Sequence, residues 1–246
     1  MINQQEYIQK GKGDTIILLH GLFGALSNWQ SVLTFLSKNY KVIIPLIPIT
    51  KIDKKKANIL GLTKFVSNFI NKLKLKKFSI IGNSLGGHIG LMYTLLNPKK
   101  VQKLILTGSS GLYENSFGSS YPKRGDYNWI NTQVNHTFYN SKVISKKYIN
   151  EVYKTLNDNT QCLNILNVAR SAQRENLSDR LKEIKCPTLL IWGLNDTVTP
   201  PYVAHQFNNL INNSKLKFID KCCHAPIMEH PKIFNKIIGP FLKKIR

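Results

Sequence analysis

Short apolar segments alternate with amphipathic segments along most of the chain, and this alternation limits the fold more than any other feature. Short runs rich in β-branched and other apolar side chains favour strands that are buried on both faces. The predicted strands are residues 14–20, 40–47, 77–82, 103–108, 187–193 and 216–220. Helical periodicity is found in residues 28–38, 60–73, 85–96, 201–210 and 231–243. The sequence therefore predicts an α/β fold, with a mostly parallel sheet and helices on both of its faces.

One long segment interrupts this alternation. Residues 112–183 contain no convincing strand, are polar and rich in Tyr and Asn, and follow helical patterns. They precede the penultimate predicted strand, so we expect a helical insertion that lies over the sheet. The predicted domain organisation is a core of residues 1–111 and 184–246, with a helical lid at residues 112–183.

The overall composition places few further limits on the class of protein. A length of 246 residues with 42% hydrophobic residues suits one α/β domain with an insertion. No apolar run approaches the roughly 18 residues that a membrane-spanning helix needs. The N-terminus shows no signal-peptide pattern, and the four cysteines lack zinc-ligand spacing. We therefore expect a soluble cytoplasmic protein with reduced thiols, without membrane insertion, metal or organic cofactor.

The net charge of +22 is large for a chain of this length. Nucleic-acid readout favours arginine gathered in one patch. Only five of the 35 basic residues are arginine, and the lysines are scattered along the whole chain. Lys, Asn and Ile all have A+T-rich codons, so we interpret the charge as a result of genomic base composition, with a functional role of the lysines as the alternative. We expect weak, salt-sensitive attraction to anions, no specific nucleic-acid partner, and a small-molecule substrate.

The segment Gly82-Asn83-Ser84-Leu85-Gly86 fits the pattern G-x-S-x-G at a predicted strand-to-helix turn. Chemistry in parallel sheets gathers beyond the carboxyl ends of the strands, which is where Ser84 lies. Glycines permit a turn sharp enough to expose the serine hydroxyl. Ser84 is therefore a candidate nucleophile. The alternative is a glycine-rich turn whose serine only caps the following helix.

A serine nucleophile needs a base and an acid that orients the base. Among the six histidines, His224 follows the last predicted strand and reaches the same sheet edge as Ser84. Asp196 follows residues 187–193 at that edge, and Asp220 is a rival because it ends the last strand. We predict His224 as the base and Asp196 as the acid, although Asp196 could instead be an ordinary turn residue.

A further motif, His20-Gly21-Leu22-Phe23-Gly24, follows the first predicted strand. Glycines there allow the backbone to approach a substrate closely. We expect the Leu22 amide and the Leu85 amide to stabilise an oxyanion during attack on a carbonyl. An ordinary glycine turn is the alternative interpretation.

Together, HGLFG, GNSLGGH, LLIWGLNDTVTP and DKCCHAPIMEHP resemble the α/β-hydrolase superfamily in order and spacing over nearly the whole chain. Its small lid-bearing serine hydrolases are the most similar subgroup. The resemblance implies that Ser84, Asp196 and His224 form a catalytic triad, that Leu22 and Leu85 supply the oxyanion hole, and that residues 112–183 form the lid. No cofactor is implied.

Esterases and the C–C bond hydrolases of aromatic breakdown share these motifs, and so do the non-hydrolytic 2-succinyl-6-hydroxy-2,4-cyclohexadiene-1-carboxylate synthases. The sequence departs from the family where PLIPITKIDKKK, residues 45–56, replaces the frequent D-x-x-G-x-G-x-S. We expect a serine hydrolase of a small-molecule ester or related carbonyl compound. The alternatives are a C–C bond hydrolase, a lyase or synthase, and a binding module with an inactive triad.

Substrate contacts are expected from the insertion. Arg170 and Arg174 lie four residues apart, hence on one helix face. Arg174 is the candidate for holding a substrate carboxylate, whereas solvated surface charge is the alternative. Trp129 is a candidate for lining an acyl pocket, with lid packing as its alternative. The sequence leaves the natural substrate and the oligomeric state open.

Overall fold

The computed structural model describes residues 7–24, 26–115 and 122–243, and these contain a single seven-stranded sheet in the order β1-β3-β2-β4-β5-β6-β7. All neighbouring strands are parallel except β1, which pairs antiparallel with β3. The strands are β1 Tyr7–Lys10, β2 Thr15–Leu19, β3 Lys41–Pro45, β4 Phe78–Asn83, β5 Val101–Thr107, β6 Thr188–Gly193 and β7 Ser214–Ile219. The predicted α/β class is confirmed, and the edge strand β1 is an addition that the sequence pattern did not predict.

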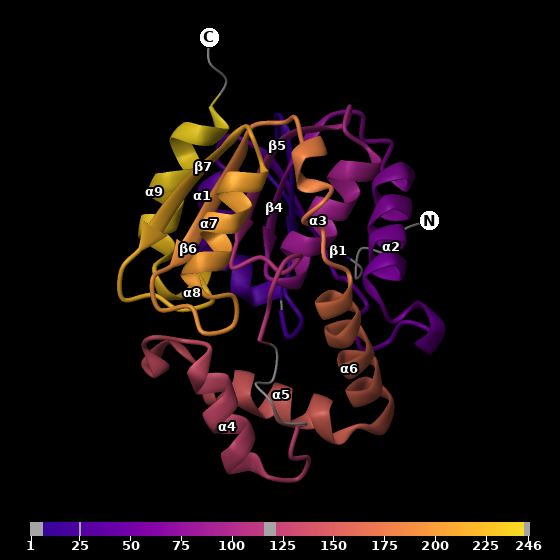
Figure 1. Cartoon of the computed structure of the whole chain (residues 1–246), viewed down its shortest axis with the longest axis vertical. Coiled ribbons are helices and arrows are strands. Elements are labelled where there is room, and N and C mark those ends of the chain that lie inside the picture. The colour runs from indigo at the N-terminus through magenta and orange to yellow at the C-terminus, as the bar shows by residue number, and fades with distance from the viewer. Residues whose placement is uncertain (1–6, 25, 116–121, 244–246) are drawn as a thin grey trace.

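Helices cover both faces of the sheet (Figure 1). The helices of the core are α1 Gln30–Leu36, α2 Ile59–Lys72, α3 Leu85–Leu96, α7 Pro201–Leu210, α8 Pro226–Glu229 and α9 Pro231–Leu242. Short 3-10 helices precede α1 and α2, at Leu26–Trp29 and Lys54–Lys56. Successive strand residues point to opposite faces. In β2, Ile16 and Leu18 pack with α1 and α9, whereas Ile17 and Leu19 pack with α2 and α3.

The described part of the insertion, residues 112–115 and 122–183, is helical and contains no strand. Its helices are α4 Tyr127–His136, α5 Lys146–Asn157 and α6 Asn159–Arg174, with 3-10 turns at Ser141–Val143 and Leu181–Glu183. Asp126, Ser145 and Asp158 begin these three helices, and each side chain accepts a hydrogen bond from an amide of the first turn. Residues 116–121 of the predicted lid, and residues 1–6, 25 and 244–246 of the predicted core, lie outside the described residues.

The insertion is attached to the core at α6, which lies beside α2 (Figure 1). The Ser171 hydroxyl accepts from the Ile59 amide at 3.0 Å. The Asn164 side-chain amide donates to the carbonyls of Thr50 and Ile52 at 3.2 and 2.8 Å. Helices α4 and α5 lie beyond the carboxyl ends of the parallel strands (Figure 1). The insertion therefore faces the sheet edge at which chemistry is expected.

Within the described residues, no helix combines the length and the apolar character that crossing a membrane requires.

Candidate active site

Ser84 lies in the sharp turn between β4 and α3 with backbone angles of φ 53° and ψ −121°. A side chain at Gly86 would come within 2.1 Å of the Leu19 carbonyl oxygen, and one at Gly82 within 2.5 Å of the Gly86 carbonyl oxygen. Glycine is therefore needed at both flanking positions for this turn to form. Ser84 occupies the N-cap position of α3 without making a side-chain cap hydrogen bond, so the capping interpretation is wrong.

The Ser84 hydroxyl instead faces His224, which follows β7. Ser84 Oγ and His224 Nε2 are 2.9 Å apart. On the other side of the ring, His224 Nδ1 lies 3.1 and 3.0 Å from Asp196 Oδ1 and Oδ2. With the proton on Nδ1, the imidazole donates to the carboxylate and accepts from the serine hydroxyl. The three predicted residues are thus joined from three separate strand ends.

The carboxylate of Asp196 is held rigidly. Its side chain is fully buried, and Oδ1 accepts from the amides of Val198 and Thr199 at 2.9 Å each. The Thr199 hydroxyl donates to Oδ2 at 3.0 Å. These bonds satisfy a buried charge and fix its orientation toward the ring. The rival Asp220 is exposed at the surface.

The electrostatics around His224 favour its protonated form. Burial acts to lower the pKa of the ring, but the adjacent Asp196 carboxylate, with smaller contributions from Glu114 and Glu229, outweighs it. The pKa of His224 is therefore raised above its ordinary value of 6.5. A base that holds a proton more firmly is suited to receive one from the serine hydroxyl.

The segment after β2 lies directly against the serine. Gly21 is so close that a side chain there would meet Ser84 Cβ at 3.3 Å, and the Gly24 amide closes the turn onto the Gly21 carbonyl at 2.9 Å. Leu22 lines the cavity beside Ser84, and Leu85 is the first residue of α3, where helix amides lack intrahelical partners. His20 instead connects this segment to the loop after β3, because its Nε2 accepts a hydrogen bond from the Ile47 amide at 3.0 Å.

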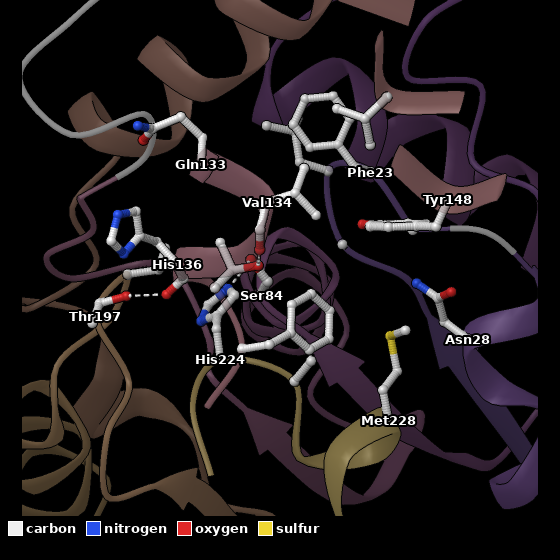
Figure 2. A pocket seen from close by; sticks show the side chains of 18 of the residues that line it. Phe23, Asn28, Ser84, Gln133, Val134, His136, Tyr148, Thr197, His224 and Met228 are labelled. Carbon is white, nitrogen blue, oxygen red and sulfur yellow. Dashed lines mark hydrogen bonds between the residues drawn. The ribbon is translucent and has the colours of Figure 1, made fainter. Parts of the chain in front are cut away.

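A cavity of about 340 Å³ opens above Ser84 and His224. Figure 2 shows side chains from the core and from the insertion converging on it. The core wall includes Gly21, Leu22, Phe23, Asn28, Ala225 and Met228. The insertion wall includes Trp129, Gln133, Val134 and Phe138 from α4 and its following turn, and Tyr148 and Val152 from α5.

Of the two candidate substrate contacts, only Trp129 lies at the cavity, and Arg174 does not. Trp129 lines the cavity. Arg174 is exposed at the last residue of α6 and does not belong to the cavity lining, and Arg170 is exposed as well. The geometry therefore gives Arg174 no contact with a molecule in this cavity. The periodicity of residues 170–174 correctly placed both arginines on a helix, but it did not show which way that face points.

Several lining residues were not predicted. Tyr148, Gln133 and Met228 line the cavity, and Figure 2 shows their positions around it. Gln133 and Tyr148 lie on the amphipathic helices α4 and α5, and Met228 lies on the four-residue α8. No sequence signal separates these three from surface or packing residues. Phe23 also lines the cavity and lies in the HGLFG motif, but only the Leu22 amide was predicted from that motif.

The described residues near the site include free thiols but no group of metal ligands. All four cysteines are free. Cys222 and Cys223 are buried beside His224, and burial raises the pKa of both thiols. Over residues 7–24, 26–115 and 122–243, no three His, Cys, Asp or Glu side chains are grouped so that they could hold a metal ion.

Comparison with known proteins identifies the class. The family model for the α/β hydrolase fold matches residues 14–231. The chain therefore belongs to the α/β-hydrolase family, as its motifs had suggested, and it is an α/β-fold hydrolase.

Three individual proteins illustrate the similarity. The crystal structure of MGS-MChE2, an α/β hydrolase enzyme from the metagenome of lagoon sediments of Mar Chica, Morocco, is 36% identical, with a TM-score of 0.79 and coverage of 96% of this chain and 93% of that one. The mouse monoacylglycerol lipase ABHD6 is 26% identical, covering 96% of this chain and 77% of its own length. The 2-hydroxy-6-oxo-6-(2'-aminophenyl)hexa-2,4-dienoic acid hydrolase of Metapseudomonas resinovorans is 28% identical, with 98% and 88% covered.

Proposed function

We propose that this hydrolase is a serine esterase that cleaves small, uncharged esters through Ser84, His224 and Asp196. The observation that carries the proposal is the continuous hydrogen-bonded chain from Ser84 Oγ through the imidazole to the buried carboxylate. A serine hydroxyl is a weak nucleophile until a base accepts its proton, and here the base lies 2.9 Å away.

The proposed reaction has two stages. In the first, Ser84 Oγ bonds to the carbonyl carbon while its proton moves to His224 Nε2 and the carbonyl electron pair moves to oxygen. The ester C–O bond then breaks, the alcohol leaves with the proton from His224, and an acyl-enzyme remains. In the second, water gives a proton to His224 and attacks the acyl carbon. The bond from that carbon to Ser84 Oγ then breaks, Oγ takes the proton from His224, and the acid is released. Asp196 holds the ring and stabilises its charged form.

The amides of Leu22 and Leu85 are the proposed oxyanion donors. Gly21 packs against Ser84, which brings the Leu22 peptide beside the hydroxyl, and Leu85 begins α3 directly after Ser84. Backbone donors at a helix start need no rearrangement when charge develops on the carbonyl oxygen. Removing one such donor typically costs about 2.7–4 kcal/mol of transition-state stabilisation.

We further propose that residues 112–183 act as a lid over a core of residues 1–111 and 184–246, and that the lid selects the substrate. None of the described residues that line the cavity is Lys, Arg, Asp or Glu, on a chain whose net charge is +22. Among the described lining residues, a substrate carboxylate would find only His136 and His224 as possible cationic partners, and pairing with His224 would remove the neutral base, which is costly. The lining therefore favours an uncharged ester over an acid, with Trp129 and Val134 contacting the apolar part.

Cleavage of a C–C bond is the second candidate function. It is favoured by the 28% identity to the Metapseudomonas resinovorans enzyme, whose substrate is by its name a dienoic acid. The described lining holds no Lys or Arg to pair with an acid in this cavity, so ester hydrolysis ranks first.

The test compares purified wild type with Ser84→Ala on three sets of substrates. These are p-nitrophenyl esters of two to eight carbons, carboxylated vinylogous diketones, and the substrate of the 2-succinyl-6-hydroxy-2,4-cyclohexadiene-1-carboxylate synthases. We expect wild type to hydrolyse the esters and Ser84→Ala to lose that activity. Turnover of a carboxylated substrate without esterase activity would contradict the proposal and would favour the C–C hydrolase or the synthase. Equal ester hydrolysis by wild type and Ser84→Ala would remove Ser84 from the mechanism.

A further inference from the structure

The Glu229 carboxylate, at the end of α8, joins two segments that are far apart in the sequence. Its Oε1 accepts from the Cys223 amide at 2.8 Å. Its Oε2 accepts from the amides of Tyr139 and Asn140 at 2.7 and 3.2 Å. One side chain therefore connects the residue before His224 to the turn that follows α4 of the insertion.

That turn is also bonded directly to the loops of the base and the acid. The His224 amide donates to the Thr137 carbonyl at 3.1 Å, and the Thr197 hydroxyl donates to the His136 carbonyl at 2.9 Å (Figure 2). The last residue of α4, His136, and the turn residues Thr137 and Phe138 belong to the cavity lining. The wall that a substrate touches and the loop that carries the base thus form one hydrogen-bonded unit.

We propose that Glu229 is a positioning residue for His224, and that it couples the base to the cavity wall built by the turn after α4. The inference rests on the proposed serine hydrolase mechanism. Glu229 itself does not line the cavity. It acts through the Cys223 amide on one side and through the Tyr139 and Asn140 amides on the other.

The chemistry of these contacts requires a carboxylate. Three backbone N–H groups point at Glu229, and a carboxylate offers acceptors on both oxygens. A glutamine in the same place has one acceptor oxygen and one NH₂ donor, so it can satisfy only one of the two segments. Aspartate keeps the charge but is one methylene shorter, and it cannot span contacts of 2.7 and 2.8 Å in opposite directions.

Glu229 also acts on His224 through its charge. Burial lowers the pKa of His224, and the surrounding carboxylates raise it to a net value above the ordinary one. Removing the Glu229 charge should therefore lower the pKa of His224, which keeps the ring neutral and active at lower pH. The titratable groups around His224 are Asp196 after β6, Glu114 after β5, Glu229 on α8, His136 on α4 and the adjacent Cys223.

The test compares Glu229→Gln and Glu229→Asp with wild type and with the control Glu183→Gln. Glu183 is an exposed carboxylate paired with Arg180 at 3.3 Å. Its substitution therefore removes one negative charge at a position that is not part of the site. The readouts are kcat and KM for a p-nitrophenyl ester across pH, with circular dichroism to verify folding. A displacement of the base by about 1 Å reduces turnover on the order of 100-fold.

For Glu229→Gln we expect kcat to fall between about 10- and 100-fold, with KM within about twofold of wild type. The acidic limb of the pH profile should move to lower pH. Glu229→Asp should show a similar fall in kcat. The acidic limb of its pH profile should stay at the wild-type pH, because the negative charge remains. Glu183→Gln should match wild type in all three readouts.

The proposal is overturned if both Glu229 variants fold and keep wild-type kcat, or if Glu229→Gln loses activity only through a raised KM with an unmoved acidic limb. If Glu229→Gln does not fold, Glu229→Asp decides, and wild-type kcat in that variant contradicts the coupling. Failure of the serine mechanism is recognised separately, because Ser84→Ala would then retain the wild-type rate.

Discussion

The two walls of the cavity are built from different kinds of constraint. On the core side, the turn around Ser84 depends on backbone contacts, with glycines that no other residue can replace without collision. On the insertion side, α4 and α5 present side chains from amphipathic helices, and many apolar side chains could fill those positions. Under the proposed function, the difference means that the chemistry is fixed by backbone geometry, whereas the choice of substrate depends on exchangeable side chains.

The largest expected effect is on the core wall. Replacing His224 with alanine removes the proposed base and leaves the Ser84 hydroxyl without its 2.9 Å partner. We expect ester turnover to fall on the order of 10⁴- to 10⁶-fold with little change in KM. The measurement is steady-state kinetics at neutral pH. A loss of less than about tenfold would mean that another group is the base.

A pair of glycine substitutions compares the two regions directly. Alanine at Gly86 would place Cβ at 2.1 Å from the Leu19 carbonyl oxygen, so we expect a loss of about 3 kcal/mol or more in the free energy of unfolding. Gly125, in the insertion, has φ +81°, but a Cβ added there would have no neighbouring atom within 4 Å, so alanine should cost only about 1 kcal/mol of strain. Urea denaturation measures both, and equal costs would mean that the turn at Ser84 is no more tightly constrained than the loop at Gly125.

A substitution on the insertion wall should change selectivity and not the chemistry. Val134 points into the cavity near Ser84 (Figure 2). Phenylalanine at this position would occupy space that an acyl chain needs. We expect the ratio of kcat/KM for octanoate to acetate p-nitrophenyl esters to fall about tenfold, with acetate turnover nearly unchanged. An equal fall for both esters would mean that this wall participates in the chemistry.

The smallest expected effect concerns pH. The base works in its neutral form, and a raised pKa means that protonation already removes it at a higher pH. In wild type, kcat/KM should therefore be half-maximal on the acidic side at a pH above 6.5. A half-maximal point below 6.5 would mean that burial outweighs the neighbouring carboxylates in solution.

The same contrast explains how much the sequence could predict. The strands, the turn at Ser84 and the residues Asp196 and His224 follow from patterns that are local or that depend on chain order, because parallel strand ends must meet at one sheet edge. The edge strand β1 has only four residues, two of them exposed, and its pattern is too short to be distinguished from a loop.

The insertion was predictable only in outline. Its helical character follows from periodicity, and its position before the penultimate strand follows from the interrupted alternation. The direction of each helix face depends on contacts with distant residues, such as Ser171 with Ile59. For that reason Arg174 was a reasonable candidate from its spacing, yet it lies at the exposed end of α6. No sequence pattern indicated a role for Glu229, because its three amide partners come from two other segments.

The most direct test of the central claim is covalent labelling with a fluorophosphonate, followed by peptide mass spectrometry. Three side chains from separate loops are proposed to make one hydroxyl nucleophilic. We expect one label per molecule on the peptide that contains Ser84, and labelling at least about 100-fold slower in His224→Ala. Labelling of a different residue, or equal rates in wild type and His224→Ala, would contradict the account.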